Sequence, residues 1–132
     1  MFEYVTEFES QVAEFFGSPY AVATDCCTHA IELCLRHTGD NNISIPSRTY
    51  VSIPMTFMKL GLDWSWRDEE WEDSYRIHNS NIIDGAVLWG EGVYERGSFT
   101  CLSFQFKKHL NLGRGGMILL EDRDDRDALK KM

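Results

Sequence analysis

One connection between two apolar runs constrains the fold and chemistry of this chain more than any other stretch. Residues 99–104 and 117–120 are largely apolar, which is typical of buried β-strands. The connection between them holds Lys107, Lys108, a histidine and several glycines. A lysine held between buried strands can lose its charge, and the neutral amine can form a Schiff base with a carbonyl group. The alternative is a solvated basic turn, because lysines are usually exposed.

Length and composition predict one compact, acidic domain over residues 1–132. The chain is 43% hydrophobic and carries a net charge of -8. This content is enough for a buried core, whereas the negative charge argues against nucleic-acid binding, which needs a basic face. No apolar run reaches the roughly 20 residues of a membrane-spanning helix, and glutamates interrupt the N-terminus where a signal peptide would be apolar. We therefore expect a cytoplasmic protein with no membrane or nucleic-acid partner.

The four cysteines do not form a metal-binding pattern. They are Cys26, Cys27, Cys34 and Cys101. No CxxC pair is present, and no cysteine–histidine cluster has the spacing of a zinc site. The sequence therefore predicts reduced thiols, as in a cytosolic protein, and no metal site.

The first third of the chain predicts a helix, a strand and a second helix. Apolar residues recur at three- and four-residue spacing from residue 4 to 16, so a helix should end at Gly17. A strand over residues 20–24 then leads into a helix with Thr28 as its N-cap. Such a turn suits a phosphate, because the first backbone N–H groups of a helix lack intrahelical partners. A capped helix without a ligand is the alternative, and His29 is expected on its surface.

The middle of the chain predicts further alternation of strands and helices. Strands are expected at residues 42–46, 62–66 and 81–84. The helix after the first of them should hold Pro54 near its first turn, and residues 67–75 should form a surface turn or short helix. The third strand ends in Asp84, at the place where open α/β sheets hold ligand groups. An ordinary helix-cap or turn aspartate is the alternative reading of Asp84.

The lysine connection resembles the Schiff-base segment of the DegT/StrS family of sugar aminotransferases. These are pyridoxal-phosphate (PLP) enzymes of the aspartate-aminotransferase fold. The family segment reads Ser-Phe, three variable residues, Lys, and then Gly-x-Gly-Gly. Here the corresponding residues are Ser103-Phe104, Lys108 and Gly113-Arg114-Gly115-Gly116. The resemblance implies that Lys108, and not Lys107, forms the internal aldimine with PLP and is the catalytic lysine.

The resemblance assigns cofactor-binding roles to five further positions. Cys27 and Thr28 occupy the turn that holds the PLP phosphate in the family, and Ser103 is a second phosphate ligand. Tyr50 lies where the family has an aromatic residue that stacks on the PLP ring, although by chemistry alone it is equally a core or rim aromatic. Asp84 lies where the family aspartate pairs with the pyridinium nitrogen.

Three features depart from the family pattern. Cys27 replaces a glycine, which weakens phosphate binding if that position needs a positive φ or a close approach of the backbone. Val87 and Trp89 replace a glutamine and a histidine that follow the family aspartate. The chain also lacks a long insertion before residue 82 and ends where the family continues into a small C-terminal domain, so we expect that domain to be absent.

The resemblance implies a condensed PLP-binding large domain. We expect a three-layer α/β/α fold with a mostly parallel sheet and one antiparallel strand after Gly116. The first functional hypothesis is an aminotransferase that takes an amino group from a donor such as glutamate to a keto-sugar nucleotide. The second is a PLP-binding or degenerate protein with a regulatory or interaction role. A pure interaction protein is the third, and the joint presence of Tyr50, Asp84 and Lys108 argues against it.

We predict that the chain forms a homodimer. A condensed domain leaves apolar surface exposed where the absent parts would pack, and large apolar patches are usually covered. Light scattering at micromolar concentration should give twice the mass of one chain. A monomeric mass under these conditions would contradict the prediction.

Overall fold

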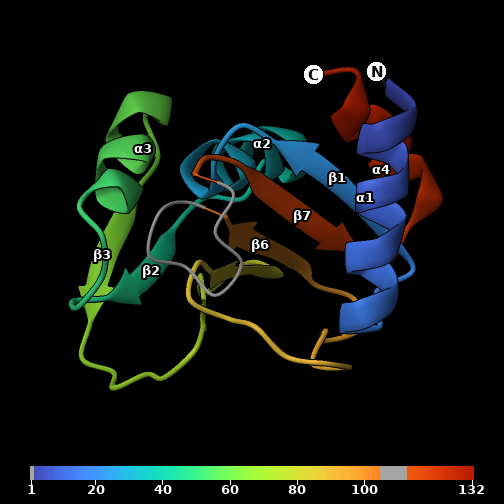
Figure 1. The fold of residues 1–132 in the computed structure, drawn as a ribbon. Helices are drawn as coiled ribbons and strands as arrows, with labels where there is room; N and C mark the ends of the chain where they lie inside the picture. The colour runs from blue at the N-terminus through green and yellow to red at the C-terminus, as the bar shows by residue number, and fades with distance from the viewer. Residues whose placement is uncertain (1, 105–112) are drawn as a thin grey trace.

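The computed structural model describes residues 2–104 and 113–132 of the chain (Figure 1). The helices are α1 (Phe2–Phe16), α2 (Cys27–Thr38), α3 (Ser52–Leu60) and α4 (Arg123–Lys130). The strands are β1 (Tyr20–Thr24), β2 (Ile43–Pro46), β3 (Trp64–Arg67), β4 (Tyr75–Arg76), β5 (Ile82–Gly85), β6 (Phe99–Ser103) and β7 (Gly116–Leu120). Within the described ranges, no helix has both the length and the apolar character needed to span a membrane.

The larger sheet is mixed. Its strand order is β1-β7-β6-β5-β4, and β7 runs antiparallel to both of its neighbours, which confirms the reversal expected after Gly116. The mostly parallel sheet is not confirmed, because β5–β6 is the one parallel pairing among the described strands of this sheet. Strands β4 and β5 are joined by a short link, so they pair antiparallel. A parallel pairing would need a crossover of about a dozen residues or more. Strands β2 and β3 form a separate parallel pair.

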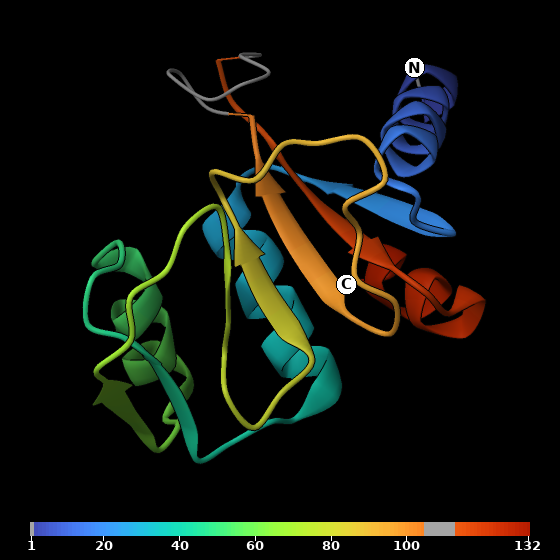
Figure 2. The same ribbon diagram turned by 90° about the horizontal axis from the view of Figure 1, so that it is seen from below.

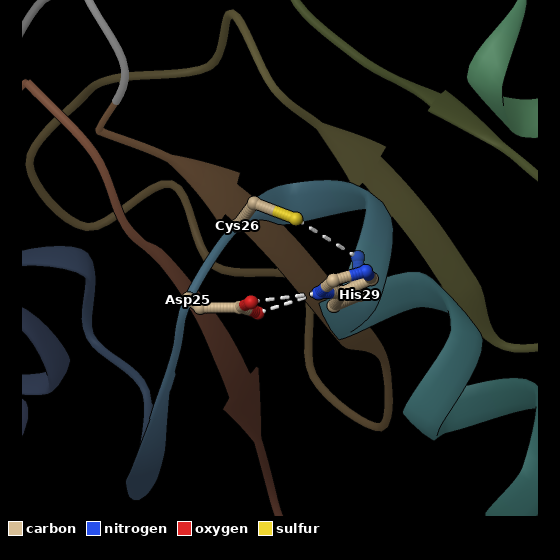
Figure 3. Close-up of side chains that lie close together, drawn as sticks. All are labelled: Asp25, Cys26 and His29. Carbon is tan, nitrogen blue, oxygen red and sulfur yellow. Dashed lines mark hydrogen bonds and ion pairs between the residues drawn. The ribbon is translucent and has the colours of Figure 1, made fainter.

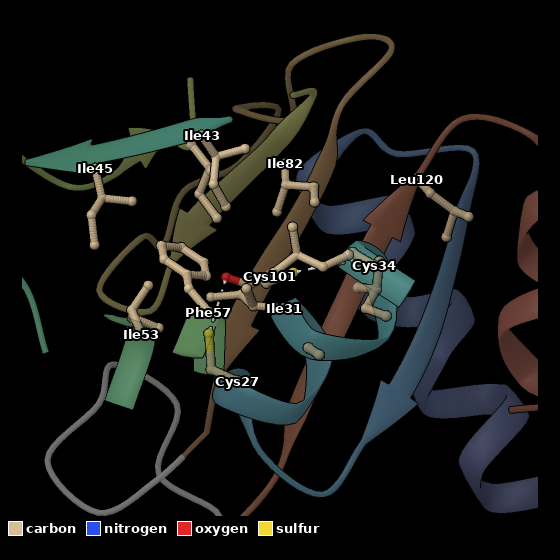
Figure 4. Close-up of a cluster of buried hydrophobic side chains, with 14 of the residues drawn as sticks. Cys27, Ile31, Cys34, Ile43, Ile45, Ile53, Phe57, Ile82, Cys101 and Leu120 are labelled. Atoms are coloured by element: carbon tan, nitrogen blue, oxygen red, sulfur yellow. Dashed lines mark hydrogen bonds between the residues drawn. The ribbon is translucent and has the colours of Figure 1, made fainter. Parts of the chain in front are cut away.

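Helices cover both faces of the five-stranded sheet. Strand β7 shows the division, because Ile118 and Leu120 pack in the cluster on the α2 side, whereas Met117 and Leu119 pack in the cluster on the α1 side. Figure 2 shows α1 and α2 on opposite sides of these strands. The α2-side cluster extends to α3 through Phe57 and is drawn in Figure 4. The alternation of side chains along a strand therefore supplies both cores.

Two of the expected helix boundaries are confirmed and one is wrong. Helix α1 ends at Gly17, whose φ of 83° is left-handed and whose N–H bonds to the carbonyl of Ala13. Pro54 lies in the first turn of α3, as predicted. The N-cap of α2 is Cys26 and not Thr28, because the Cys26 sulfur accepts the hydrogen bond of the His29 N–H at 3.4 Å. A thiol is a less usual cap than a hydroxyl, so composition favoured the wrong residue.

The start of β7 touches the turn that precedes α2. A Cβ atom placed on Gly116 would lie 2.5 Å from the backbone carbon of Cys26 and 2.7 Å from the backbone nitrogen of Cys27. Neither backbone atom can move without displacing the first turn of α2. Position 116 therefore has to be glycine because of close backbone approach, and not because of a positive φ.

We expect Gly116→Ala to lower the free energy of unfolding by more than about 2 kcal/mol, because the methyl group overlaps fixed backbone atoms. Gly90→Ala is the matched control, since its Cβ would meet at 2.9 Å only the side chain of Val93, which is 46% exposed and can move. Urea unfolding of the two variants checks the prediction. If both variants lost the same free energy of unfolding, the close backbone contact at Gly116 would not be what requires a glycine there.

Candidate functional site

Five of the residues singled out from the sequence line one cavity of about 230 Å³. They are Cys27, Thr28, Tyr50, Asp84 and Ser103, and Ser52, Ile53 and Ala86 complete the described lining. The cavity lies where β5 and β6 end and α2 begins. A larger hollow of about 790 Å³ shares Tyr50, Asp84 and Ala86 with it. The sixth predicted residue, Lys108, lies outside the described residues.

Asp84 is buried at the end of β5, where it lines both hollows. Asp84 is only 5% exposed. The Tyr75 hydroxyl donates a hydrogen bond of 2.7 Å to Oδ2, and the backbone N–H of Ala86 donates one of 3.0 Å to Oδ1. The Cys27 sulfur lies 3.9 Å from Oδ1. Such donors are what a buried carboxylate needs to stay ionised away from water.

Tyr75 is a site residue that the sequence reasoning missed. Residues 67–75 were expected at the surface, but Tyr75 is 5% exposed and pairs with Asp84 across β4 and β5. Burial, and then the charge of Asp84, raise the pKa of Tyr75, so its hydroxyl stays protonated. The sequence does contain a pattern that could have predicted this burial. Tyr75 and Ile77 alternate with the polar Arg76, which is the alternation of a short strand.

Cys27 fits the glycine position of the family without backbone strain. It is the first residue of α2, and the non-glycine residues with a positive φ in the described ranges are Asn42, Asp73 and Asn79. Its sulfur points inward, 3.5 Å from the carbonyl oxygen of Cys101. The expected weakening through a positive φ therefore has no basis at this position.

One side of the cavity is rich in hydroxyl groups. Thr28 and Ser52 form a side-chain hydrogen bond of 3.0 Å, and Ser103 lies at the end of β6. The first turn of the 12-residue helix α2 adds backbone N–H groups that have no acceptor within the helix. Hydroxyl groups and a helix N-terminus together suit an anionic group such as a phosphate.

The remaining predicted residue, Tyr50, is a rim aromatic. Tyr50 is 64% exposed, and it lines both hollows. Beside it, Arg48 and Trp71 form a reciprocal pair, in which the guanidinium donates to the Trp71 carbonyl at 2.6 Å and the indole N–H donates to the Arg48 carbonyl at 2.7 Å. This pair fastens the segment before β4 to the turn after β2, and both residues line the larger hollow.

The two accessory positions after Asp84 have apolar roles. Val87 lies at the edge of the larger hollow and is 37% exposed. Trp89 packs against α1, with ring centroids 5.2 Å from Phe15 and 5.1 Å from Phe16. Neither side chain supplies a polar group near Asp84.

A second polar cluster lies beside the cavity, at the start of α2 (Figure 3). Asp25, Cys26 and His29 bring a carboxylate, a thiol and an imidazole within 4.8 Å of one another. The His29 ring nitrogen Nδ1 lies 2.7 Å from Asp25, and this hydrogen bond lowers the pKa of Asp25. Arg114 lies 4.0 Å from the same carboxylate. The ion pair and the helix cap account for this arrangement without a metal, and His29 is exposed as expected.

The fold is α/β, and the polar groups of the cavity gather at the ends of sheet strands and at the start of one helix, where α/β folds commonly bind ligands. The sequence model of the DegT/DnrJ/EryC1/StrS aminotransferase family matches residues 1–82. The chain belongs to this family. The comparison with curated proteins gave no match.

Solved structures, several of them described as aminotransferases, share the fold at low sequence identity. CalS13, a sugar aminotransferase from Micromonospora echinospora, is 18% identical with a TM-score of 0.79, over 96% of this chain and 48% of that one. AtS13 from Actinomadura melliaura is 20% identical with a TM-score of 0.79, over 95% and 48%. A putative PLP-dependent aminotransferase from Bacillus cereus is 14% identical with a TM-score of 0.81, over 97% and 48%. The chain thus spans about half the length of these proteins.

Pyridoxal phosphate is the cofactor of this group of proteins. The Bacillus cereus protein is described as PLP-dependent, and a GDP-4-keto-6-deoxymannose-3-dehydratase of the same fold holds a trapped PLP-glutamate geminal diamine. That dehydratase is 15% identical to this chain with a TM-score of 0.73, over 96% of this chain and 46% of its own.

We predict that restoring the family glycine destabilises this chain. Cys27 is helical and buried, so Cys27→Gly should lower the free energy of unfolding by about 1–3 kcal/mol through a lost side chain and a freer backbone. Cys27→Ala should lose less, because it keeps the helical preference, and the pair separates packing from backbone effects. Thermal or urea unfolding measures both. A glycine variant as stable as wild type would point to hidden strain at position 27.

Proposed function

We propose that this chain binds PLP in the cavity of about 230 Å³ and acts as an aminotransferase-like protein of the sugar-modifying type. One observation supports this more than any other. Cys27, Thr28, Tyr50, Asp84 and Ser103 come from four separate segments, yet all five line that cavity. The family register along the sequence points to each of these residues independently of the fold, so their convergence is not a product of the pocket itself.

The residues present fit the parts of the cofactor. The phosphate would be held by the hydroxyls of Thr28 and Ser103 and by the start of α2, because anions suit a helix N-terminus. Tyr50 presents an exposed ring on which the planar pyridine can stack. The buried carboxylate of Asp84 would pair with the ring nitrogen. PLP, once bound, supplies an electron sink for the chemistry of amino groups.

The chain's own residues would then divide the work. As a carboxylate, Asp84 would favour a proton on the ring nitrogen of the cofactor. Lys108 would hold the cofactor covalently through its amine and, when released, move a proton at the substrate carbon as a general base. Because Lys108 lies outside the described residues, its role rests on its register with the family segment.

We infer an amino donor such as glutamate and a keto-sugar nucleotide as acceptor. Two structural neighbours support this, since the dehydratase carries a PLP-glutamate adduct and DesI was solved with its TDP-sugar product. The hollow of about 790 Å³ next to Asp84 offers space for a second ligand. Arg48 at its edge provides a cationic group of the kind that binds carboxylates and phosphates.

A homodimer is part of the proposal. Val51, Met55 and Met58 recur at helical spacing around α3 and are 60–71% exposed, and Tyr50 lies next to them. This apolar stripe borders the cavity, so a second chain packed on it would also cover the site. The four free cysteines fit a cytoplasmic location, where thiols stay reduced.

A PLP-binding protein without transamination is the second candidate. The observation that favours it is Val87, an apolar side chain at the rim of the larger hollow where the family has a glutamine. With valine at this position, the accessory polar group of the family glutamine is lost. Such a protein would bind PLP through the same residues and have a regulatory or interaction role.

The first test is the visible absorbance of the purified chain mixed with PLP, for wild type, Lys107→Ala and Lys108→Ala. We expect a band that borohydride converts into a stable adduct on the protein, measured by mass spectrometry. The adduct should disappear in Lys108→Ala and persist in Lys107→Ala, which is the matched control. If the adduct were lost only in Lys107→Ala, Lys107 and not Lys108 would be the lysine that binds PLP. If no variant showed a band, the proposal would be overturned.

A second measurement separates the two candidates. An aminotransferase should convert bound PLP to its amine form when glutamate is added, with a shift of the visible band. A protein that binds PLP but leaves the band unchanged with glutamate and other amino donors would support the non-catalytic alternative.

A further inference from the structure

We propose that Tyr75 and Thr49 form a hydrogen-bond relay that positions the carboxylate of Asp84 and keeps it ionised. The inference deepens the proposed function, because it concerns the group that would face the ring nitrogen of the cofactor. Tyr75 and Thr49 are positioning residues in this scheme, since they act through Asp84.

The geometry sets the direction of the relay. The Tyr75 hydroxyl lies 2.7 Å from Oδ2 of Asp84 and 2.6 Å from Oγ1 of Thr49. An ionised carboxylate can only accept, so Tyr75 donates to Asp84. The phenol oxygen then accepts from the hydroxyl of Thr49. The two bonds polarise one another, because each donor strengthens the next in a poorly solvated interior.

The fold holds the relay in place. Tyr75 is opposite Asp84 in the register of β4 and β5. Its ring packs edge-on against Trp71 with a centroid distance of 4.9 Å, and Trp71 is fixed by its two bonds with Arg48. Arg48 precedes Thr49 in the chain, so the same contact fixes both ends of the relay. These contacts hold the phenol beside Asp84.

The relay supplies polarity that the following residues do not. Val87 and Trp89 stand where the family has polar side chains, and neither contributes a donor near Asp84. Around Asp84, the described groups are the Tyr75 hydroxyl, the Ala86 N–H and the Cys27 thiol. Of these, Tyr75 makes the shortest contact, and it comes from the segment that replaces the family insertion.

The test compares Tyr75→Phe with Tyr94→Phe. Tyr94 is also buried, in the core cluster on the α1 side of the sheet. Its hydroxyl donates a hydrogen bond of 2.8 Å to the backbone carbonyl of Ser98. Both variants lose one buried hydroxyl, but only Tyr75→Phe removes a donor from Asp84. The readout is the pH titration of the Asp84 carboxyl carbon by NMR in the protein without PLP, assigned with Asp84→Asn.

We expect the titration midpoint of Asp84 to rise by about one pH unit in Tyr75→Phe, about a tenfold gain in proton affinity, because the lost donor favoured the charged form. Tyr94→Phe should leave it unchanged. Thr49→Val should shift it in the same direction by less, while Thr49→Ser keeps the hydroxyl and should match wild type. This second pair serves if Tyr75→Phe fails to fold.

In the protein loaded with PLP, Tyr75→Phe should weaken cofactor affinity about tenfold and alter the pH dependence of the visible band. An Asp84 titration that is equal in all variants overturns the relay, whether or not PLP binds. A wild type that does not bind PLP, with the Tyr75→Phe shift still present, overturns the proposed function and leaves the relay standing as the support of a buried carboxylate.

Discussion

The buried carboxylate of Asp84 is the constraint on which the candidate site depends. Moving an ionised carboxylate out of water costs several kcal/mol unless donors replace the lost hydration. Here the Tyr75 hydroxyl on β4 and the backbone N–H of Ala86 donate to the carboxylate, and the Cys27 sulfur on α2 lies 3.9 Å from it. Asp84 thus connects β4 and α2 to the end of β5, and the pairing of β4 with β5 brings Tyr75 within reach of it.

A second constraint is the backbone contact between β7 and the turn before α2. Gly116 pairs with Ser103 across β6 and β7, and it leaves no room for a Cβ against Cys26. The end of β6 is thereby placed next to the start of α2, so that Ser103 and Thr28 line the same cavity. The glycines of the Gly-x-Gly-Gly segment therefore have different physical roles, since Gly113 and Gly115 have left-handed φ angles of 79° and 128° whereas Gly116 gives space.

The departures from the family pattern have local explanations in the packing. Cys27 enters as an ordinary helical residue, and its thiol fills the floor of the cavity beside Asp84. Trp89 is used in the core between the sheet and α1. Cys27 thus changes the lining of the cavity, whereas Trp89 contributes to packing on the α1 side of the sheet.

The sequence by itself determined the helices, the strands other than β4, the reversal after Gly116, the family and the residues that converge on the cavity. These are properties of local periodicity and of motifs whose order along the chain is preserved. Only the tertiary structure decided the mixed sheet, the Cys26 cap in place of Thr28 and the burial of Tyr75. A two-residue strand such as β4 has too little pattern of its own, and the burial of Tyr75 depends on the pairing of β4 with β5, which places it opposite Asp84. Long-range hydrogen bonds carry no period along the chain, and for that physical reason the relay to Asp84 had to be seen in three dimensions.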